Sequence, residues 1–516
     1  MPWNYDNALS RIVRLNRTAP EVNVQSYREE YLPRFQTLNE ERRTQGLSAQ
    51  RPLFDLARNE AILVDGVHVY INLLDFDASL TDLERETETS HARALRFLHF
   101  HYSACDRAVE DVGAQRVDFH GHRLHAIVTE PSDNEAERVR RALELAEQIR
   151  TVAAAATEEF GGGLASRYRI GIDSGICVAI NNGRAGEHEP LFLGNPANFA
   201  AKLADGDEPG VFVSTHVAQV IAALTGRPVT MNESYSRRGA RSFNASEVSS
   251  VIAGGQAYTA SSRILESWRS DIAADRSTRS TNLSFNFYEH EPPLRTIDYA
   301  DLFPSHSIRM PMATLFADID GYTSYIQSCM RSMLDVGTAV RNLHVIRGEM
   351  AAVVRDDFGG RKVRFIGDCL HSIIAEGSSG KISEQATVTS SIHLAGALRS
   401  SFNLAREVLP GIDGLGLAIG IELGTSPISR IGVRGDRSVR TSVSKSSISA
   451  EERQSVSDGV TTAIGDKLYE AGNAAVKSYF RSRAVVDMTY DVAVANVPTA
   501  AVPSTLETEE PRAHIE

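Results

Sequence analysis

Two aspartates in the second half of the chain are placed so that together they could hold divalent metal ions. Asp318 ends an apolar, β-rich run in the segment LFADIDGYTSYI, and Asp368 follows a glycine in the segment RKVRFIGDCLHSII. A strand ending at Asp318 and a hairpin turning at Asp368 would bring the carboxylates onto neighbouring strands. Two carboxylates that meet repel each other unless cations neutralise them, and hard divalent ions prefer such oxygen ligands. We therefore predict a metal site at this pair.

Each aspartate also has a simpler interpretation. Asp318 alone would be an acidic residue at a strand end, and Asp368 alone would be a turn residue favoured beside glycine. The residues after Asp318 would in addition offer backbone N–H groups to a phosphate chain where a helix begins. The occurrence of both aspartates in a frame that the chain repeats favours the metal site.

That frame is an internal repeat, and the aspartates occupy its second copy. When Asn72 in VYINLLDFDASL is set against Asp318, His122 in QRVDFHGHRLHAIV falls against Asp368 without a gap. A third pair of segments, RYRIGIDSGICVAINNG and LGLAIGIELGTSPISRIG, matches in the same order, which indicates a duplication. Asn72 and His122 are poor substitutes for bridging carboxylates, and Asp75 would replace one only in a shifted register. We therefore expect the first copy to have lost its metals.

The elements around these residues predict the same α+β unit twice, with helices packed on an antiparallel sheet. Apolar residues at three- and four-residue spacing predict helices between the strands, and further helices are expected at 22–46 and 261–275. The β-rich runs lie at 67–77, 115–129, 167–180, 311–319, 361–375 and 415–431. The predicted divisions are an N-terminal helical extension (1–54), a domain lacking metal carboxylates (55–260), a connector (261–304), a domain with them (305–497) and a disordered tail (498–516).

The composition is that of a globular protein. The 516 residues exceed the size at which a single hydrophobic core stops growing. A net charge of -12 disfavours nucleic-acid partners, and no apolar run reaches the roughly 20 residues that a membrane crossing requires. The start of the sequence lacks the apolar core of a signal peptide, and the four cysteines show no paired spacing. We expect a soluble, cytoplasmic, reduced protein with no membrane partner.

On the carboxylate pair and the duplicated frame, the chain resembles the class III adenylate and guanylate cyclases over most of 60–215 and 310–470. The resemblance implies two tandem domains of the ferredoxin-like, palm-type cyclase fold, which pair into a pseudo-symmetric dimer within one chain or in a homodimer. It also implies that two divalent ions, Mn²⁺ preferred and Mg²⁺ allowed, activate a ribose 3′-hydroxyl and steady a triphosphate. The implied metal ligands are Asp318, Ile319 and Asp368, and the implied substrate-binding residues of that segment are Ile319, Asp320, Gly321, Tyr322 and Thr323.

Family active sites form between two domains, and the resemblance places the second half of the site in the first copy. In GNPANFAAK, Asn198 matches the residue that orients the ribose, and Lys202 takes the place of the usual arginine. Four-residue spacing puts both on one helix face. Lysine supplies a point charge where arginine grips in a fork, and the alternative is a helix start with Asn198 as a cap and Lys202 solvated. In the second copy the expected equivalents are Ser449 and Arg453.

The position that reads the base in this family lies four residues before the hairpin aspartate, and here the facing copy has Asp118. A carboxylate accepts hydrogen bonds, so it suits a base edge with N–H groups and disfavours adenine. Uracil, cytosine and guanine all remain. Leu191, seven residues before Asn198, offers weak recognition of a large purine edge. The alternative for Asp118 is a solvated strand residue.

These departures from both purine patterns resemble the pyrimidine cyclases of bacterial Pycsar antiphage defence. The resemblance implies a cyclase that converts UTP, with CTP as second choice, into the 3′,5′-cyclic monophosphate and pyrophosphate, and a separate effector that reads the product. Two alternatives stay open: a guanylate or adenylate cyclase, and a catalytically silent nucleotide-binding regulator in which both interfaces are degenerate.

Overall fold

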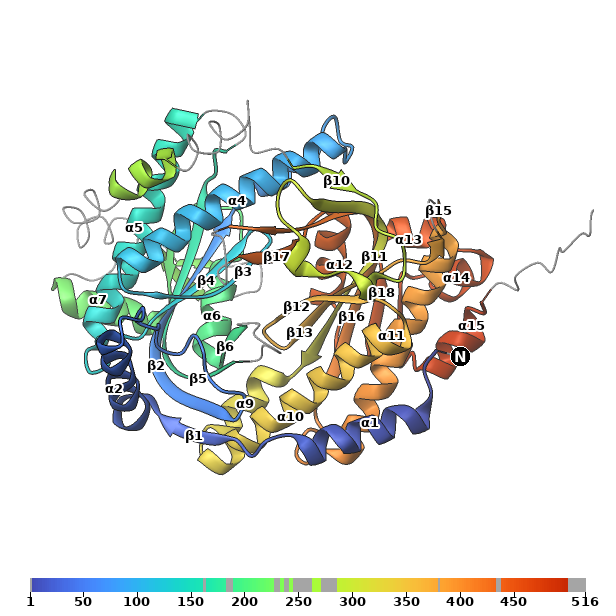
Figure 1. Cartoon of the computed structure of the whole chain (residues 1–516), viewed down its shortest axis with the longest axis horizontal. Coiled ribbons are helices and arrows are strands. Elements are labelled where there is room, and N and C mark those ends of the chain that lie inside the picture. The colour runs from blue at the N-terminus through green and yellow to red at the C-terminus, as the bar shows by residue number, and fades with distance from the viewer. Residues whose placement is uncertain are drawn as a thin grey trace, which may run out of the picture.

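Two α/β units lie side by side in the computed structural model (Figure 1). The structure describes the chain except residues 1, 161–163, 182–188, 227–232, 236–240, 245–261, 271–284, 379–380, 433–437 and 500–516. Nearly all of the predicted tail and part of the predicted connector lie outside the described residues, while the helix expected at 261–275 is present over 262–270. Among the described residues, no helix combines the length and the apolarity needed to cross a membrane.

The N-terminal domain is a mostly antiparallel sheet covered by helices. Its strands are β2 (Glu60–Leu73), β3 (Gln115–His120), β4 (Arg123–Val128), β5 (Tyr168–Asn181), β6 (Pro190–Leu193), β7 (Gly210–Val213), β8 (Glu233–Tyr235) and β9 (Arg241–Asn244). Its helices are α3 (Phe76–Ser79), α4 (Glu88–Asp111), α5 (Glu135–Phe160), α6 (Asn195–Leu203) and α7 (Thr215–Thr225). The strand order is β3-β4-β2-β5-β7-β9-β8, and the apolar core lies between this sheet and α4, α5 and α7.

The C-terminal domain repeats this plan. Its strands are β10 (Phe287–Tyr288), β11 (Ser307–Asp320), β12 (Arg361–Ile366), β13 (Cys369–Ile374), β14 (Gly377–Ser378), β15 (Lys381–Ile382), β16 (Gly416–Ile431), β17 (Val439–Ser442), β18 (Thr461–Ile464) and β19 (Ala484–Val486). Its helices are α9 (Tyr322–Cys329), α10 (Met333–Ala352), α11 (Glu384–Val408), α12 (Lys445–Ser455), α13 (Asp466–Ala471), α14 (Ala474–Tyr479) and α15 (Tyr490–Asn496). The order is β12-β13-β11-β16-β18-β19, and α10 and α11 cover the core.

The strand registers confirm the predicted duplication. Asn72 of β2 pairs with Arg169 of β5, and Asp318 of β11 pairs with Ala418 of β16 at the equivalent point. In both hairpins the ladder shifts at the same place, between Arg116 and Asp118 and between Lys362 and Arg364. The predicted α+β class and the tandem, pseudo-symmetric pair of domains are therefore confirmed.

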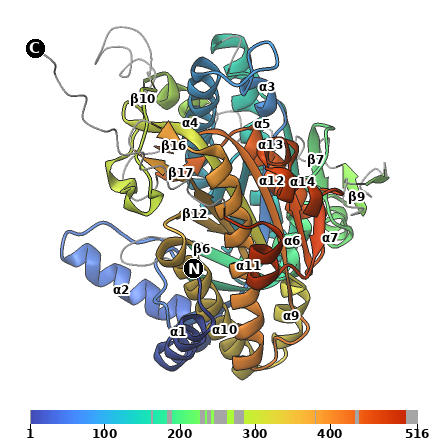
Figure 2. The ribbon, with the colours of Figure 1, turned by 90° about the vertical axis from the view of Figure 1, so that its right-hand side faces the viewer.

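The N-terminal extension contacts both domains. Helix α1 (Tyr5–Thr18) lies against α10 and α11 of the C-terminal domain (Figure 2), where Arg11 forms ion pairs with Glu349 at 2.7 Å and Asp357 at 2.8 Å. The strand that follows, β1 (Asn23–Ser26), pairs with β2 of the N-terminal domain. The prediction of a single helix over 22–46 is therefore wrong at its start, because the first residues form β1 and pair with β2. A π-helical turn covers Tyr27–Tyr31, and α2 (Leu32–Thr44) follows.

Candidate active site

A cavity of about 610 Å³ lies between the two domains. The ends of β11 and α9 and the turn of the β12–β13 hairpin line it from the C-terminal domain, and β3, β6 and α6 line it from the N-terminal domain. Among the described residues, the lining includes Ala201 and Asp205 of the α6 region but not Lys202. The other predicted site residues all line it, namely Asp118, Leu191, Asn198, Asp318, Ile319, Asp320, Gly321, Tyr322, Thr323 and Asp368.

The two aspartates of the predicted metal site face the same cavity. Asp318 lies near the end of β11, and Asp368 lies in the β12–β13 turn after Gly367, whose φ of 61° glycine adopts without strain. Burial, together with the neighbouring carboxylate of Asp318, raises the pKa of Asp368 well above its usual range. A bound cation would remove this repulsion, so the pair fits a divalent ion.

Two carboxylates alone do not complete a metal coordination sphere. Within the described part of the chain, no group of three or more His, Cys, Asp and Glu side chains is arranged to hold a metal ion. Divalent ions such as Mg²⁺ commonly take their remaining oxygen ligands from substrate phosphates and water. The pair at Asp318 and Asp368 therefore suits an ion that binds together with a phosphorylated substrate.

Arg347 of α10 supports the turn that carries Asp368, and the sequence pattern did not single it out. Its guanidinium donates to the carbonyl of Gly367 and lies over the ring of Phe365, 4.4 Å from the centroid. Burial lowers the pKa of Arg347 to about 10. Helix α10 holds a second arginine, Arg341, so the residue type alone did not distinguish Arg347.

The segment after Asp318 forms the start of α9. Gly321 is its N-cap with φ of 82°, and Gly321, Tyr322 and Thr323 line the cavity, so the helix begins beside it. Tyr322 is 2% exposed and packs in the core, which leaves its backbone, not its ring, for substrate. The Asp320 carboxylate accepts from the backbone N–H of Gly459 at 3.0 Å, so it ties this segment to the loop before β18.

Asn198 reaches this segment from the other domain. Its Nδ2 donates to Oγ1 of Thr323 at 3.3 Å, across the interface. Leu191 of β6 is 9% exposed and belongs to the apolar cluster that includes residues of α9. The structure thus places Asn198 in the same cavity as the carboxylate pair, on the side of the other domain.

The predicted equivalence of Asn198 with Ser449 is wrong by one residue. A Cβ on Gly171 would lie 2.2 Å from the carbonyl oxygen of Ala200, and a Cβ on Gly420 would lie 2.1 Å from that of Ala450, so these close helix–strand contacts are equivalent. From Gly420 to α12, the C-terminal copy has one residue more than the N-terminal copy has from Gly171 to α6. The predicted match of Asn198 with Ser449 would require two more residues. The position equivalent to Asn198 is therefore Ile448.

The same correction applies one turn later on α12. Lys202 corresponds to Glu452 and not to Arg453. Arg453 instead lies 3.4 Å from Asp466 of its own domain. The second interface therefore lacks both the asparagine and the cation at these two positions.

Asp118 does not stand alone in the cavity. Its carboxylate forms an ion pair with Arg364 of the C-terminal domain, and Arg364 also donates to the carbonyl of Phe119 at 2.5 Å. The Asp118 side chain is 19% exposed, so the alternative of a solvated strand residue is wrong. A base edge in this part of the cavity would meet an acceptor and a donor side by side.

Glu189, just before β6, is a second buried carboxylate at this interface. It pairs with Lys362 at 3.3 Å and with Arg440 at 2.6 Å, both from the C-terminal domain. Burial alone would raise the pKa of Glu189, but these cations outweigh it and hold the pKa below its usual value. This side of the cavity is thus crossed by ion pairs that sequence spacing did not indicate.

The second, pseudo-symmetric interface has no comparable arrangement among its described residues. Asn72 donates to the carbonyl of Ala204 at 3.3 Å, and burial lowers the pKa of His122 to about 3, so the imidazole is neutral at pH 7. Asp75 pairs with Arg167 at 2.8 Å and is not directed to a metal position. The cavity at this interface, of about 340 Å³, is lined by Asp77, Leu80, Glu422, Lys445, Ser446, Ile448, Ser449, Glu452 and Lys467.

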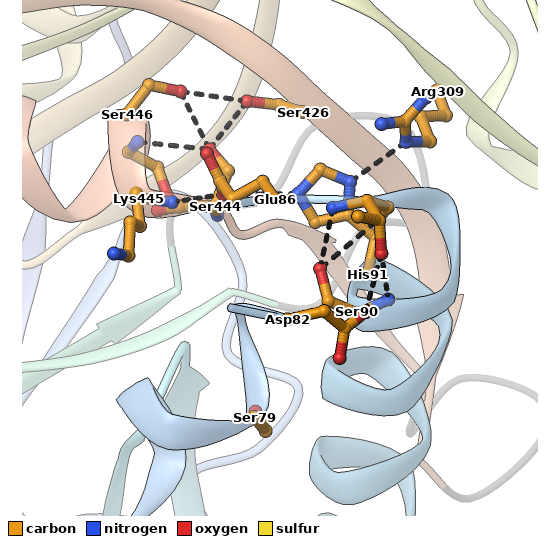
Figure 3. Close-up of polar contacts among 12 residues, drawn as sticks. Ser79, Asp82, Glu86, Ser90, His91, Arg309, Ser426, Ser444, Lys445 and Ser446 are labelled. Carbon is orange, nitrogen blue, oxygen red and sulfur yellow. Dashed lines mark hydrogen bonds and ion pairs between the residues drawn. The ribbon is translucent and has the colours of Figure 1, made fainter. Parts of the chain in front are cut away.

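A polar network closes the edge of this second interface (Figure 3). Glu86 accepts from the backbone N–H of Lys445 at 2.7 Å and contacts His91 at 3.1 Å. Arg309 of the C-terminal domain in turn donates to Nδ1 of His91 at 3.0 Å. The polar groups here bind one another across the interface, which is a structural role.

Comparison with known proteins agrees with this geometry. The chain is 43% identical to a uridylate cyclase of a Rhizobium species over 482 residues, which cover 90% of each protein. It is 36% identical to a uridylate cyclase of Pseudomonas aeruginosa over 501 residues, which cover 95% of this chain and 90% of the relative. A crystal structure of a class III adenylyl cyclase-like ATP-binding protein from Pseudomonas aeruginosa matches 96% of this chain and 99% of its own, with a TM-score of 0.81 and 34% identity. No protein-family model matches. The chain belongs to the family of these uridylate cyclases, which is built on the class III cyclase fold.

Proposed function

We propose that the chain is a nucleotide cyclase that converts UTP into 3′,5′-cyclic UMP and pyrophosphate, with CTP as the second substrate. The observation that carries the proposal is the position of Asn198 opposite Asp318 and Asp368 in one cavity. The names of the two relatives support the base assignment. In this reaction the ribose 3′-oxygen bonds to the α-phosphorus, the bond to the pyrophosphate leaving group breaks, and the 3′-hydroxyl proton passes to solvent water.

Class III cyclases in general use divalent metal ions, and we assign two here, with Mn²⁺ preferred, to Asp318, Ile319 and Asp368. When bound, such ions would lower the pKa of the 3′-hydroxyl and offset charge on the phosphates. The remaining roles belong to the chain itself.

The N-terminal domain would position the nucleoside. Asn198 holds the ribose so that its 3′-hydroxyl lies near the α-phosphorus, which is a contribution of orientation. Lys202, one turn further along α6, would meet phosphate charge by extending toward the cavity from its rim. The N-terminus of α9 at Gly321 and Thr323 would bind the phosphate chain through backbone N–H groups.

Base recognition would use the ion pair of Asp118 and Arg364. Uracil presents N3–H between two carbonyl oxygens, so a carboxylate can accept from N3–H while a guanidinium donates to a neighbouring oxygen. Leu191 adds an apolar contact and no polar group for a purine edge. This pair suits uracil, although it does not by itself reject the other bases.

A second candidate has one observation in its favour, because the structural relative from Pseudomonas aeruginosa is described as binding ATP. A protein that binds ATP without turnover, or an adenylate cyclase, would share the fold.

The biological setting that we propose is synthesis of a cytoplasmic second messenger in antiphage defence, with a separate effector that binds the product.

Incubation with each of the four NTPs and Mn²⁺, followed by chromatography, tests activity and base together. We expect cyclic UMP and pyrophosphate in equal amounts from UTP, less product from CTP, and little from ATP. Asp75→Asn in the degenerate copy is the matched control for Asp318→Asn. Preferential cyclisation of ATP, or binding of ATP with no product from any NTP, would overturn the proposal.

A further inference from the structure

Three sets of ion pairs among the described residues cross the interface between the domains around the larger cavity, and none of them could form between two copies of the same domain. The first is Asp118 with Arg364. These two residues occupy the same position in their hairpins, since Asp118 pairs with His125 on β4 and Arg364 pairs with His371 on β13. The pseudo-two-fold relation therefore brings one position of the repeat against itself, with opposite charges on the two copies.

A pair of like domains would lose this complementarity. Two N-terminal domains would place Asp118 against Asp118, and two C-terminal domains would place Arg364 against Arg364. The paired side chains are only 19% and 13% exposed, so solvent would screen the repulsion weakly. Like charges in contact across an interface oppose association and discriminate between partners.

The second set is Glu189 with Lys362 and Arg440. The β5–β6 and β16–β17 registers make Val439 the equivalent of Glu189. In a pair of C-terminal domains, Lys362 and Arg440 would face Val439 and would lack the buried carboxylate. Buried cations without a counter-charge are strongly unfavourable.

The third set has its charges reversed. Glu451 of α12, in the C-terminal domain, pairs with Arg123 at 2.8 Å and lies 3.7 Å from His120 of the N-terminal domain. The C-terminal equivalents of Arg123 and His120 are Cys369 and Ile366. A C-terminal domain paired with its own kind would bury Glu451 against a thiol and an isoleucine.

We propose that these contacts make the pairing face of each domain specific for the other kind of domain, so that like-with-like pairing is excluded. The partner is the domain of the same chain, because the N-terminal extension joins the two: α1 packs on the C-terminal domain and β1 extends the N-terminal sheet, with only Ala19 to Val22 between them. Each chain then forms one composite site and needs no second copy.

The equivalence of positions 118 and 364 gives a direct test in the full-length chain. Arg364→Asp sets Asp against Asp, and Asp118→Arg sets Arg against Arg. The double exchange D118R/R364D restores opposite charges at the same two positions. We expect each single variant to lower the apparent Tm by about 5–10 °C and to deprotect the β3 and β12 amides in hydrogen exchange, and the double exchange to recover at least half of both losses.

Arg263→Asp is the matched control, because Arg263, in the helix at 262–270, pairs with Asp111 of α4 away from the domain interface and is 69% exposed. We expect its Tm to stay within about 1 °C of the parent. Activity is not a readout here, since the double exchange also moves the carboxylate assigned to the base.

A second exchange, R123E/E451R, keeps the test decisive if a single variant fails to fold. A folded double exchange beside an unfolded single variant supports the proposal. The proposal would be overturned if each double exchange lowered Tm by the sum of the losses in its two single variants. It would also be overturned if light scattering detected a stable homodimer of R364D in which the β12 amides remain protected from hydrogen exchange.

Discussion

The two interfaces of the molecule share a backbone plan and differ in almost every side chain that chemistry would need. At one, Asp318 and Asp368 face Asn198 across a cavity of about 610 Å³. At the other, Asn72 and His122 hold the aspartate positions, and Ile448 stands at the position of the asparagine. The two interfaces share one backbone plan, and a few side chains distinguish the interface to which we assign metal and triphosphate.

The polar groups of the two interfaces also differ in how they are satisfied. Asn72 and Asp75 are bound to Ala204 and Arg167 of their own domain. In contrast, burial and its neighbouring carboxylate raise the pKa of Asp368, so this group is held in a state that costs stability without a cation. A bound cation would therefore stabilise the interface that carries the carboxylate pair.

The largest expected effect comes from removing a carboxylate of the intact pair. Asp318→Ala or Asp368→Ala should lower kcat for UTP by at least about 1000-fold, because charge stabilisation worth several kcal/mol is lost. Asp368→Asn should at the same time raise Tm without metal, since it removes a repulsion. Steady-state cyclisation measures kcat, and thermal unfolding measures Tm. As a control, Asp75→Ala in the other copy should change kcat by less than about twofold and Tm by less than about 2 °C. A folded Asp368 variant with parental activity would contradict the assignment.

Breaking the charged contact at Glu189 should weaken domain pairing. Glu189→Gln leaves two cations without their carboxylate and should cost about 3 kcal/mol at pH 7. The folded-state pKa of Glu189 lies below its unfolded value, so its contribution is complete above the unfolded pKa of about 4.3 and is lost as pH falls through the folded pKa.

Thermal unfolding of parent and Glu189→Gln between pH 7 and pH 3 checks this sign. The difference in Tm should be largest at pH 7 and should shrink below about pH 4. Glu144→Gln, in a contact within α5, is the control and should show a small, nearly constant difference. A difference that grows on acidification would contradict the account.

The asparagine distinguishes the two interfaces most simply. Asn198→Ala should lower kcat by about 100-fold, as expected for a preorganised polar contact to the reacting group, while Ser449→Ala and Arg453→Ala on the other side change it only slightly. Lys202→Ala should have a smaller effect than Asn198→Ala, because Lys202 lies outside the cavity lining. The opposite pattern, with Arg453 essential and Asn198 dispensable, would place the reaction between two C-terminal domains.

The smallest of the four effects concerns the base. Asp118→Ala should lower kcat/KM for UTP by about tenfold, equivalent to one polar contact, and should narrow the preference for UTP over CTP and ATP. Competition among the four NTPs measures it. An unchanged order of substrates in this variant would remove Asp118 from base recognition.

The gapless match of Asn72 and His122 with Asp318 and Asp368 made the carboxylate pair and the tandem fold predictable, because strand and hairpin lengths are identical in the two copies. The helix equivalence was not predictable, because the one extra residue lies between β16 and β17, and only the strand registers and the packing of Gly420 on Ala450 reveal it.

The ion pairs that cross between the domains could also not be predicted from the sequence. Arg364 and Glu189 lie beside other charged residues in the sequence, and the pairing of the domains gives them each other's domain as partner. Arg347 bonds to Gly367 of its own domain, a contact between residues that lie far apart in helix and hairpin. The extension looked like an isolated helix because its strand, β1, is defined by a partner far along the chain.

We propose that each chain has one working site, formed by the carboxylates of the C-terminal domain and Asn198 of the N-terminal domain. Isothermal titration of the full-length protein with 3′-deoxy-UTP and Mn²⁺ tests it directly, because this analogue binds and cannot cyclise. We predict one analogue bound per chain, weak binding of 3′-deoxy-ATP, loss of binding in Asp368→Asn, and unchanged binding in Ser449→Ala. Two analogues per chain, or binding that survives Asp368→Asn and is lost with Ser449→Ala, would contradict it.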